Sequence, residues 1–226
     1  MQRFINFFIA LCLTQVCMAQ NSDCKVMAEK LKGTYQGECS DGKANGEGFA
    51  RGEDAYSGTF KNGLPNGLGK YTWSNGDYYK GNWKKGQRDG KGEMHYTSNG
   101  KDSVVQGFWK RDAYEGKYEV PYIVHDKTFD VSRVEVSRQS KKGATVVVGE
   151  QTMSGQELNG VSGNAEFKIG AGNYLSVDSK RVGSQYVTTF QNVSFPFRVT
   201  MYYSGNSVDV ELLEEGVWNI SVMINK

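Results

Sequence analysis

The residues that could do chemistry are few in this chain and lie far apart. Its 226 residues include two histidines, His95 and His125. A zinc site needs histidine, cysteine or carboxylate ligands at short, defined spacings, and neither histidine has such neighbours. We therefore expect two ordinary imidazoles, no metal site and no cofactor.

Motifs for nucleophilic catalysis or nucleotide binding are not evident either. There is no Gly-x-Ser-x-Gly elbow. Gly170-Ala171-Gly172 begins like a dinucleotide-binding loop but lacks the final glycine and a following helix. Glu214-Glu215 stands beside a turn glycine, as in a solvated loop. We predict that the protein is not an enzyme and has no catalytic residues. The alternative is an enzyme with an unrecognised site in the C-terminal half.

The secondary structure that positions these side chains is indicated by a repeated glycine–aromatic unit. Its four copies are Tyr35-Gln36-Gly37-Glu38-Cys39, Tyr56-Ser57-Gly58-Thr59-Phe60, Tyr79-Lys80-Gly81-Asn82-Trp83 and Val105-Gln106-Gly107-Phe108-Trp109. Each copy is followed by a further glycine, and in the first three this glycine opens a Gly-x-Gly; these positions are Gly46 and Gly48, Gly67 and Gly69, Gly90 and Gly92, and Gly116. The interval between copies is about 21–26 residues, which is typical of a repeat array.

Each repeat is expected to form a β-hairpin. Side chains alternate between the two faces of a strand, so Tyr56, Gly58 and Phe60 share one face. A glycine between two inward aromatics leaves room for a neighbouring strand or ring. Asn62-Gly63 marks the turn, as do Asp41-Gly42, Asn75-Gly76 and Asn99-Gly100 elsewhere.

This pattern of Tyr-x-Gly-x-Phe/Trp followed by Gly-x-Gly resembles the MORN repeat family. The resemblance covers residues 33–118 and is strongest in the second and third copies. The fourth copy departs from it, since Val105 replaces tyrosine and Tyr118 replaces the second glycine. The resemblance implies a ribbon of stacked hairpins, used for contact with other proteins and sometimes for lipid binding, and seldom for catalysis.

The N-terminus reads as a targeting segment. Arg3 precedes a short apolar stretch, and Cys17-Met18-Ala19 offers small residues before a cut at Gln20. We predict a signal peptide over residues 1–19 and an exported protein that is periplasmic, at the cell surface or secreted. The alternative is an uncleaved anchor. After cleavage no apolar run is long enough for an integral membrane protein.

Residues 20–32 are expected to cap the array with a short helix. Residues 24–32 are good helix formers with Gly33 just beyond them. Two cysteines remain after cleavage, and cysteines in exported chains usually pair. A Cys24–Cys39 disulfide would tie this segment to the array, with a contribution of roughly 3 kcal/mol. The alternative is a buried Cys39 thiol and a free Cys24.

The composition changes in residues 119–226. The glycine columns end, and short runs of alternating apolar and polar residues begin, including 131–136, 144–148, 166–169, 186–190, 195–203, 208–212 and 218–224. Strands at this spacing predict an antiparallel β-sandwich, with a surface loop over 149–163. Phe-Pro-Phe-Arg-Val-Thr and Val-Trp-Asn-Ile-Ser-Val resemble segments of sandwich domains in exported Bacteroidota proteins. The chain is thus expected to be all-β.

Charge and aromatic residues suggest the kind of partner. The net charge is only +2, so we expect no nucleic-acid binding. A possible binding face on the repeats combines basic and aromatic side chains: Trp73, Tyr78, Lys84, Lys85, Arg88 and Tyr96. Another envelope protein is the expected partner, for which the chain acts as a scaffold. The alternative is a glycan or an anionic lipid, and packing between repeats would explain the same aromatics.

Overall fold

The computed structural model describes residues 24–98, 101–152, 165–183, 185–203 and 205–225. The predicted signal peptide, the Asn99-Gly100 turn and most of the predicted 149–163 loop lie outside these residues. The chain divides into two compact units, Met1–Ala113 and Tyr114–Lys226. No helix in the described parts of the chain is both long and apolar enough to cross a membrane.

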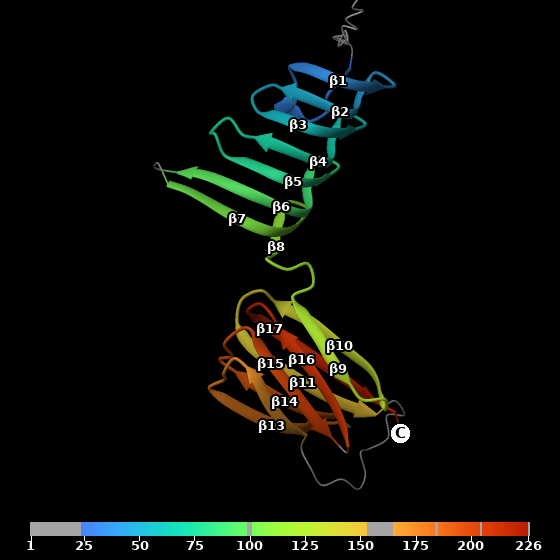
Figure 1. Ribbon diagram of the computed structural model, residues 1–226, viewed down its shortest axis with the longest axis vertical. Helices are drawn as coiled ribbons and strands as arrows, with labels where there is room; N and C mark the ends of the chain where they lie inside the picture. Colours follow the sequence, from blue (N-terminus) through green and yellow to red (C-terminus); the bar gives the residue numbers. More distant parts are fainter. Residues whose placement is uncertain (1–23, 99–100, 153–164, 184, 204, 226) are drawn as a thin grey trace, which may run out of the picture. The chain divides into compact units, whose positions relative to one another are not determined.

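The first unit is an antiparallel sheet whose strands follow one another in sequence order (Figure 1). Its strands are β1 (Thr34–Ser40), β2 (Lys43–Arg51), β3 (Ala55–Lys61), β4 (Leu64–Thr72), β5 (Tyr78–Lys84), β6 (Gln87–Ser98), β7 (Lys101–Lys110) and β8 (Ala113–Gly116). Each repeat supplies one hairpin of this sheet, as the sequence predicts. The fourth, divergent repeat continues the same sheet through β7 and β8.

Tight turns close the hairpins at one end. Asp41-Gly42, Asn62-Gly63 and Lys85-Gly86 all have positive φ at both residues. This is the geometry of the two-residue turn whose twist matches that of paired strands. Sequence analysis identified the first two turns but not Lys85-Gly86, because lysine is an unusual residue at a left-handed position.

The predicted capping helix is wrong: only a 3-10 turn, Glu29–Leu31, forms. The Lys25 and Met27 amides instead donate to the carbonyls of Gly42 and Gly63, which lie in hairpin turns. These bonds hold the segment extended across the first two hairpins, while Leu31 is fully buried beneath it. Helix propensity is therefore overridden by backbone bonds to the array. The Cys24–Cys39 disulfide is present and fixes the same segment.

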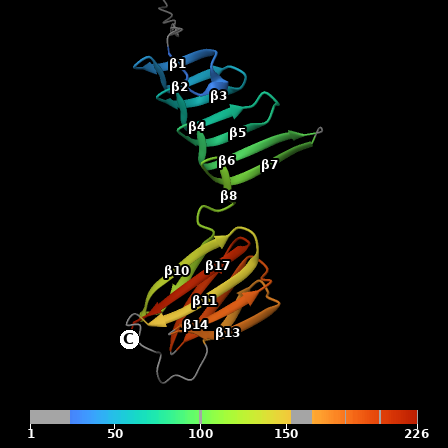
Figure 2. The same ribbon diagram turned by 180° about the vertical axis from the view of Figure 1, so that it is seen from behind.

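The second unit is a sandwich of two sheets (Figure 2). One sheet has the order β10-β17-β11-β14-β13 and the other β12-β15-β16-β9. The strands are β9 (Tyr122–Lys127), β10 (Val131–Ser140), β11 (Ala144–Thr152), β12 (Glu166–Ala171), β13 (Ser176–Val182), β14 (Gln185–Gln191), β15 (Phe197–Tyr203), β16 (Asn206–Leu212) and β17 (Gly216–Ile224).

The sandwich core comes from alternate residues of the central strands. β15, β16 and β17 each bury every second side chain, including Phe197, Val210 and Trp218. One detail differs from the purely antiparallel prediction: β11 and β17 run parallel, with Val146 opposite Trp218. Strands β9 and β13 were not anticipated. They form sheet edges and bury almost nothing, so their sequences carry no alternation.

Candidate functional site

A continuous row of glycines crosses seven strands of the repeat sheet. Each glycine faces another glycine in the backbone register of the next strand, in the order Gly37, Gly48, Gly58, Gly69, Gly81, Gly92 and Gly107. The repeated Tyr-x-Gly and Gly-x-Gly glycines thus meet in space. They form a strip of bare backbone perpendicular to the strands.

Tyrosine rings explain why one side of this row must lack side chains. A Cβ atom on Gly69 would lie 2.2 Å from the Tyr56 hydroxyl, and one on Gly92 would lie 2.1 Å from the Tyr79 hydroxyl. Each ring lies over its glycine, and its hydroxyl donates to the carbonyl of the residue three positions further along the chain. The Tyr56 hydroxyl lies 3.0 Å from the Thr59 carbonyl oxygen. Burial raises the pKa of Tyr79 to about 12, so this hydroxyl stays protonated as a donor.

The same face carries the aromatic core predicted from the sequence. Tyr56 packs edge-to-face on Phe60 at 4.9 Å between ring centroids, and Tyr79 packs on Trp83 at 5.2 Å. Such pairs stabilise a fold beyond the area that they bury. In the strand register Gly46 lies opposite Phe60, Gly67 opposite Trp83 and Gly90 opposite Trp109. Gly116 ends β8.

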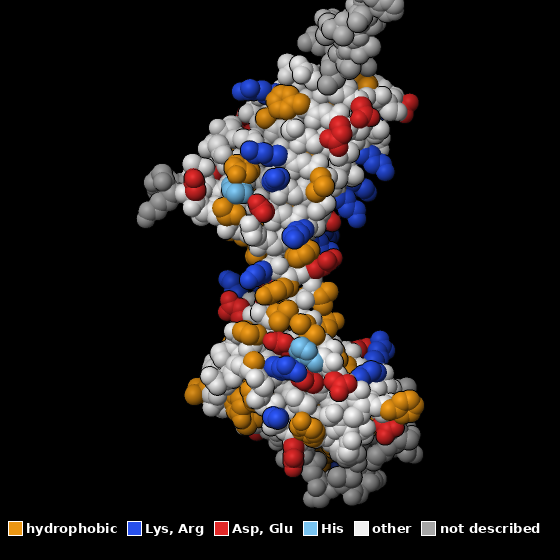
Figure 3. Space-filling view, viewed as in Figure 1, with side chains coloured by type: hydrophobic (Ala, Val, Ile, Leu, Met, Phe, Trp, Pro, Cys, Tyr) orange, Lys and Arg blue, Asp and Glu red, His pale blue; other side chains and the backbone are white. Residues whose placement is uncertain are grey.

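On the opposite face, the row forms the floor of an open groove of about 640 Å³. Gly69, Gly81, Gly92 and Gly107 line the floor. The residues beside each glycine point to this face by strand alternation and form the walls: Glu47, Ser57, Leu68, Lys70, Lys80, Asn82, Lys91, Glu93 and Gln106. We call this the glycine groove. Basic, acidic and hydrophobic side chains are interspersed on the face of the repeat unit shown in Figure 3.

Tyr78 lies on the groove side of β5 by strand alternation, and its ring contacts Lys70 and His95. The His95 ring stacks on it at 4.2 Å, nearly parallel at 13°. The Lys70 ammonium lies 3.9 Å from the Tyr78 centroid, within cation–π distance. The stacking on Tyr78 makes the His95 ring part of the side-chain packing on this face of the sheet.

The structure divides the predicted binding face between two surfaces. Tyr78 and Lys84 lie on the groove side, and Lys85 lies in the β5–β6 turn. Trp73 packs against the aromatic core on the other side, at 4.9 Å from Tyr71. Arg88 and Tyr96 share that side with buried Met94 by strand alternation. The six residues are therefore not brought together.

Arg88 is held by the core side of the sheet. Its guanidinium lies 4.3 Å from the Trp109 centroid and 5.8 Å from that of Trp73. Its Nε donates to Asp112 Oδ1 at 3.1 Å. A cation with these contacts is part of the packing, in agreement with the reading of Trp73 as a packing residue.

Sequence analysis did not single out Lys70, Leu68, Glu47 or Glu93 as site residues. A usable signal was present, because each lies next to a glycine of the row and must point away from the tyrosines. Alternation alone therefore separates groove residues from core residues once the glycines are recognised as inward positions.

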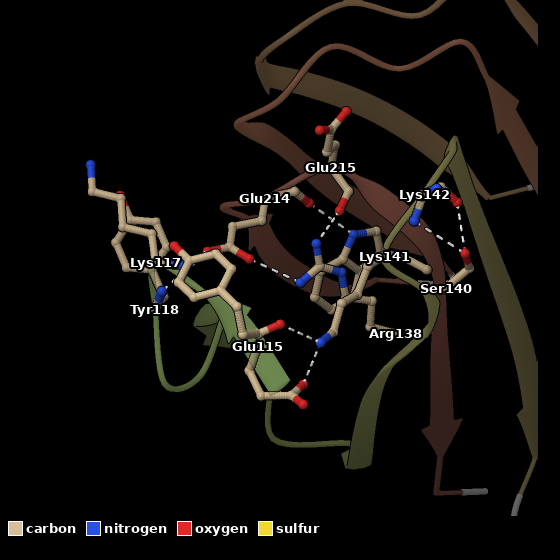
Figure 4. Close-up of polar contacts among 11 residues, drawn as sticks. Glu115, Lys117, Tyr118, Arg138, Ser140, Lys141, Lys142, Glu214 and Glu215 are labelled. Atoms are coloured by element: carbon tan, nitrogen blue, oxygen red, sulfur yellow. Dashed lines mark hydrogen bonds and ion pairs between the residues drawn. The ribbon is translucent and has the colours of Figure 1, made fainter. Parts of the chain in front are cut away.

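The second unit has its own cluster of polar contacts around Glu214 (Figure 4). Glu214 Oε2 accepts from Arg138 Nη1 at 2.9 Å, and Glu214 Oε1 accepts from the Tyr118 amide at 3.1 Å and also from the Lys117 amide. Lys141 binds Glu115 at 2.8 Å. All these groups have partners within Tyr114–Lys226, so the cluster stabilises the second unit itself.

The residues considered for metal binding or catalysis from the sequence can be located among the described residues. In those parts of the chain no three His, Cys, Asp or Glu residues are placed to hold a metal ion. His125 Nε2 lies 2.7 Å from Glu211 Oε2 on the surface of the sandwich. Gly170-Ala171-Gly172 lies at the end of β12 and leads into no helix.

With this geometry in view, the first unit is a MORN-repeat sheet. Residues 35–54, 56–78 and 79–101 match the MORN repeat. The chain is also similar to alsin from rat, with 42% identity over 72 residues, and to human alsin, with 40% identity over 72 residues. The match covers 29% of this chain and only 4% of either alsin. MORN repeats are generally non-enzymatic modules for interaction with proteins or membranes.

Proposed function

We propose that this protein is an exported, non-enzymatic scaffold of the cell envelope that holds another protein through its repeat unit. The observation that carries the proposal is the glycine groove, an exposed recess in a sheet built from interaction repeats. Its walls mix charged, amide and apolar groups, as protein-binding surfaces do. Within the described residues no three His, Cys, Asp or Glu side chains are placed to hold a metal ion.

Export is supported by the Cys24–Cys39 disulfide. Disulfides persist in oxidising compartments and are rare where thiols are kept reduced. This bond agrees with the signal peptide that the first 19 residues predict. A maleimide-labelling assay on cells of the source organism tests it: the two thiols should react only after a reductant is added. Labelling without reductant in intact cells would contradict export.

An affinity experiment tests the scaffold role. The full chain, tagged at its C-terminus, is incubated with solubilised envelope from the source organism, and the retained proteins are identified by mass spectrometry. The control bait carries Gly58→Val and Gly69→Val, which disrupt the repeat sheet at positions packed against backbone and Tyr56. We expect one protein to be retained by the natural chain and lost with the control. Equal retention by both baits, or none, would refute the proposal.

A further inference from the structure

Building on the proposed protein-binding function, we propose that the glycine groove binds an extended acidic segment of the partner protein. The segment would lie along the row of glycines, across the strands. The lysines of the groove would recognise its carboxylates, and the bare floor would admit its backbone.

The strongest observation is a pair of like charges. Lys70 on β4 and Lys80 on β5 are direct cross-strand partners on the groove face. Like charges placed directly opposite on a sheet destabilise it. Lys91 adds a third exposed ammonium from β6. An anionic ligand between these lysines would relieve the repulsion between Lys70 and Lys80 and would meet positive charge from three neighbouring strands.

Glu93 lies directly opposite Lys80 in the strand register, but neither groove carboxylate forms an ion pair with these lysines among the described residues. Glu47 accepts from the Thr59 hydroxyl at 2.6 Å. Glu93 binds Gln106 at 3.1 Å and lies 3.3 Å from His95 Nε2. Among the described residues, no ion pair within 4.0 Å involves Lys70, Lys80 or Lys91. None of the three ammonium groups is held in an ion pair, and Lys70 lies over the neutral Tyr78 ring, which leaves its charge uncompensated.

The shape of the groove suits a chain in an extended conformation. Its walls come from β2 through β7, which is five strand spacings or about 24 Å. About seven extended residues span that distance. The floor strands pair with one another on both sides through the row, so their backbone groups are already bonded. Recognition therefore depends on side chains and not on addition of a strand.

Two other anionic partners fit these observations less well. An anionic membrane favours clusters of four or more basic residues, whereas Glu47 and Glu93 line the same groove as the lysines. A glycan would need an open aromatic platform. The ring of Tyr78, the predicted aromatic on this side, already contacts Lys70 and His95, and Trp73 lies on the core side. An acidic peptide agrees best with exposed lysines beside polar walls.

Fluorescence anisotropy with a defined probe tests the proposal. The probe is a fluorescein-labelled peptide of four Glu-Ser pairs, and a peptide of four Lys-Ser pairs is its control. We expect saturable binding of the acidic probe to the full chain, with no binding of the basic probe. Affinity should fall as salt is raised, because exposed charges are screened.

Two kinds of variant locate the binding. The double variant Lys70→Glu, Lys80→Glu should lower the affinity for the acidic probe by at least about tenfold, since each reversed charge turns attraction into repulsion. Ser57→Trp, which fills the groove without changing charge, should weaken it as well. Lys61→Glu with Lys110→Glu makes the same charge change at exposed positions outside the groove and should have little effect. Circular dichroism melts should confirm that all variants fold.

Several outcomes would overturn the inference. They are no saturable binding of the acidic probe, equal weakening by both charge-reversal variants, or binding of phosphatidylserine vesicles or heparin in preference to the probe. The affinity experiment separates this failure from that of the scaffold role. If the Lys70→Glu, Lys80→Glu chain still retains the envelope partner, the scaffold role stands and the acidic-segment inference falls.

Discussion

Arg138 Nη1 lies 2.9 Å from Glu214 Oε2, and the two side chains are only 15% and 14% exposed. The Arg138 guanidinium also lies 5.4 Å from the Trp218 centroid. A nearly buried ion pair is costly to break from one side only, because the remaining charge loses its partner without regaining water. Loss of the Glu214 carboxylate would therefore leave the Arg138 charge nearly buried and without this partner.

Replacing Glu214 should destabilise the second unit. Glu214→Ala removes the Arg138 partner and leaves the Lys117 and Tyr118 amides without their acceptor. We expect the free energy of unfolding to fall by about 2–3 kcal/mol. Urea denaturation followed by Trp fluorescence measures it. Glu215→Ala is the matched control, since that side chain is exposed and Arg138 binds only its backbone carbonyl. Equal losses in both variants would contradict this account.

The glycine row predicts a steric effect in the first unit. Gly69→Ala would place a methyl group 2.2 Å from the Tyr56 hydroxyl, so the buried ring must move. We expect a loss of about 1–3 kcal/mol, as for other overpacked sites. Thermal unfolding checks this. Gly149→Ala, where nothing lies within 4 Å, should change the melting temperature little. A stable Gly69→Ala protein would show that the ring can shift freely.

Removal of the disulfide tests how the N-terminal segment is held. Cys24→Ser with Cys39→Ser opens a loop with a sequence separation of 15 residues. The chain-entropy argument gives a loss of about 3 kcal/mol. Denaturation of the natural chain with and without reductant should reproduce the difference seen between the two proteins. If reductant also lowers the stability of the double serine variant, the effect does not come from this bond.

Glu150 predicts a pH dependence of stability in the sandwich. Its side chain is 1% exposed, and Oε2 has no hydrogen-bond partner. Burial raises the pKa of Glu150 to about 7, from 4.5 in the unfolded chain. A raised carboxyl pKa favours the protonated folded form. Stability is therefore fully present below pH 4.5 and falls as pH rises, until the carboxyl is ionised above about pH 7.

A neutral substitution isolates this contribution. Glu150→Gln cannot ionise, so its free energy of unfolding should lack the fall that the natural chain shows between pH 4.5 and 7. The difference between the two proteins should grow by about 3 kcal/mol over this interval. Denaturation at a series of pH values measures both curves. A constant difference at all pH values would mean that Glu150 does not titrate in this range.

Much of the fold could be read from the sequence because its signals are local. The Tyr56, Gly58 and Phe60 spacing defines one face of a strand, and glycine turns close the hairpins. The prediction of a capping helix was wrong because the conformation of this segment depends on hydrogen bonds from the Lys25 and Met27 amides to distant turns. Helix propensity takes no account of such bonds. The parallel pairing of β11 with β17 likewise joins strands that are far apart in the sequence, so local patterns do not predict it.

The candidate site was harder to predict for a related reason. Basic and aromatic residues such as Trp73 and Tyr78 are close in sequence, yet strand alternation and the core assign them to different faces. Composition shows which residues are present but not on which side they lie. The register of seven glycines supplies that information, and it becomes visible only when strands are paired.

Because the glycine row continues from repeat to repeat, the length of the groove depends on the number of repeats. Each of the first three repeats contributes two strands and two glycines, as Gly58 and Gly69 do, and the glycines of neighbouring repeats stay in register. One duplicated repeat would therefore lengthen the groove by about 10 Å without disturbing its cross-section. Gene duplication could in this way adapt the protein to longer partner segments while leaving every existing contact in place.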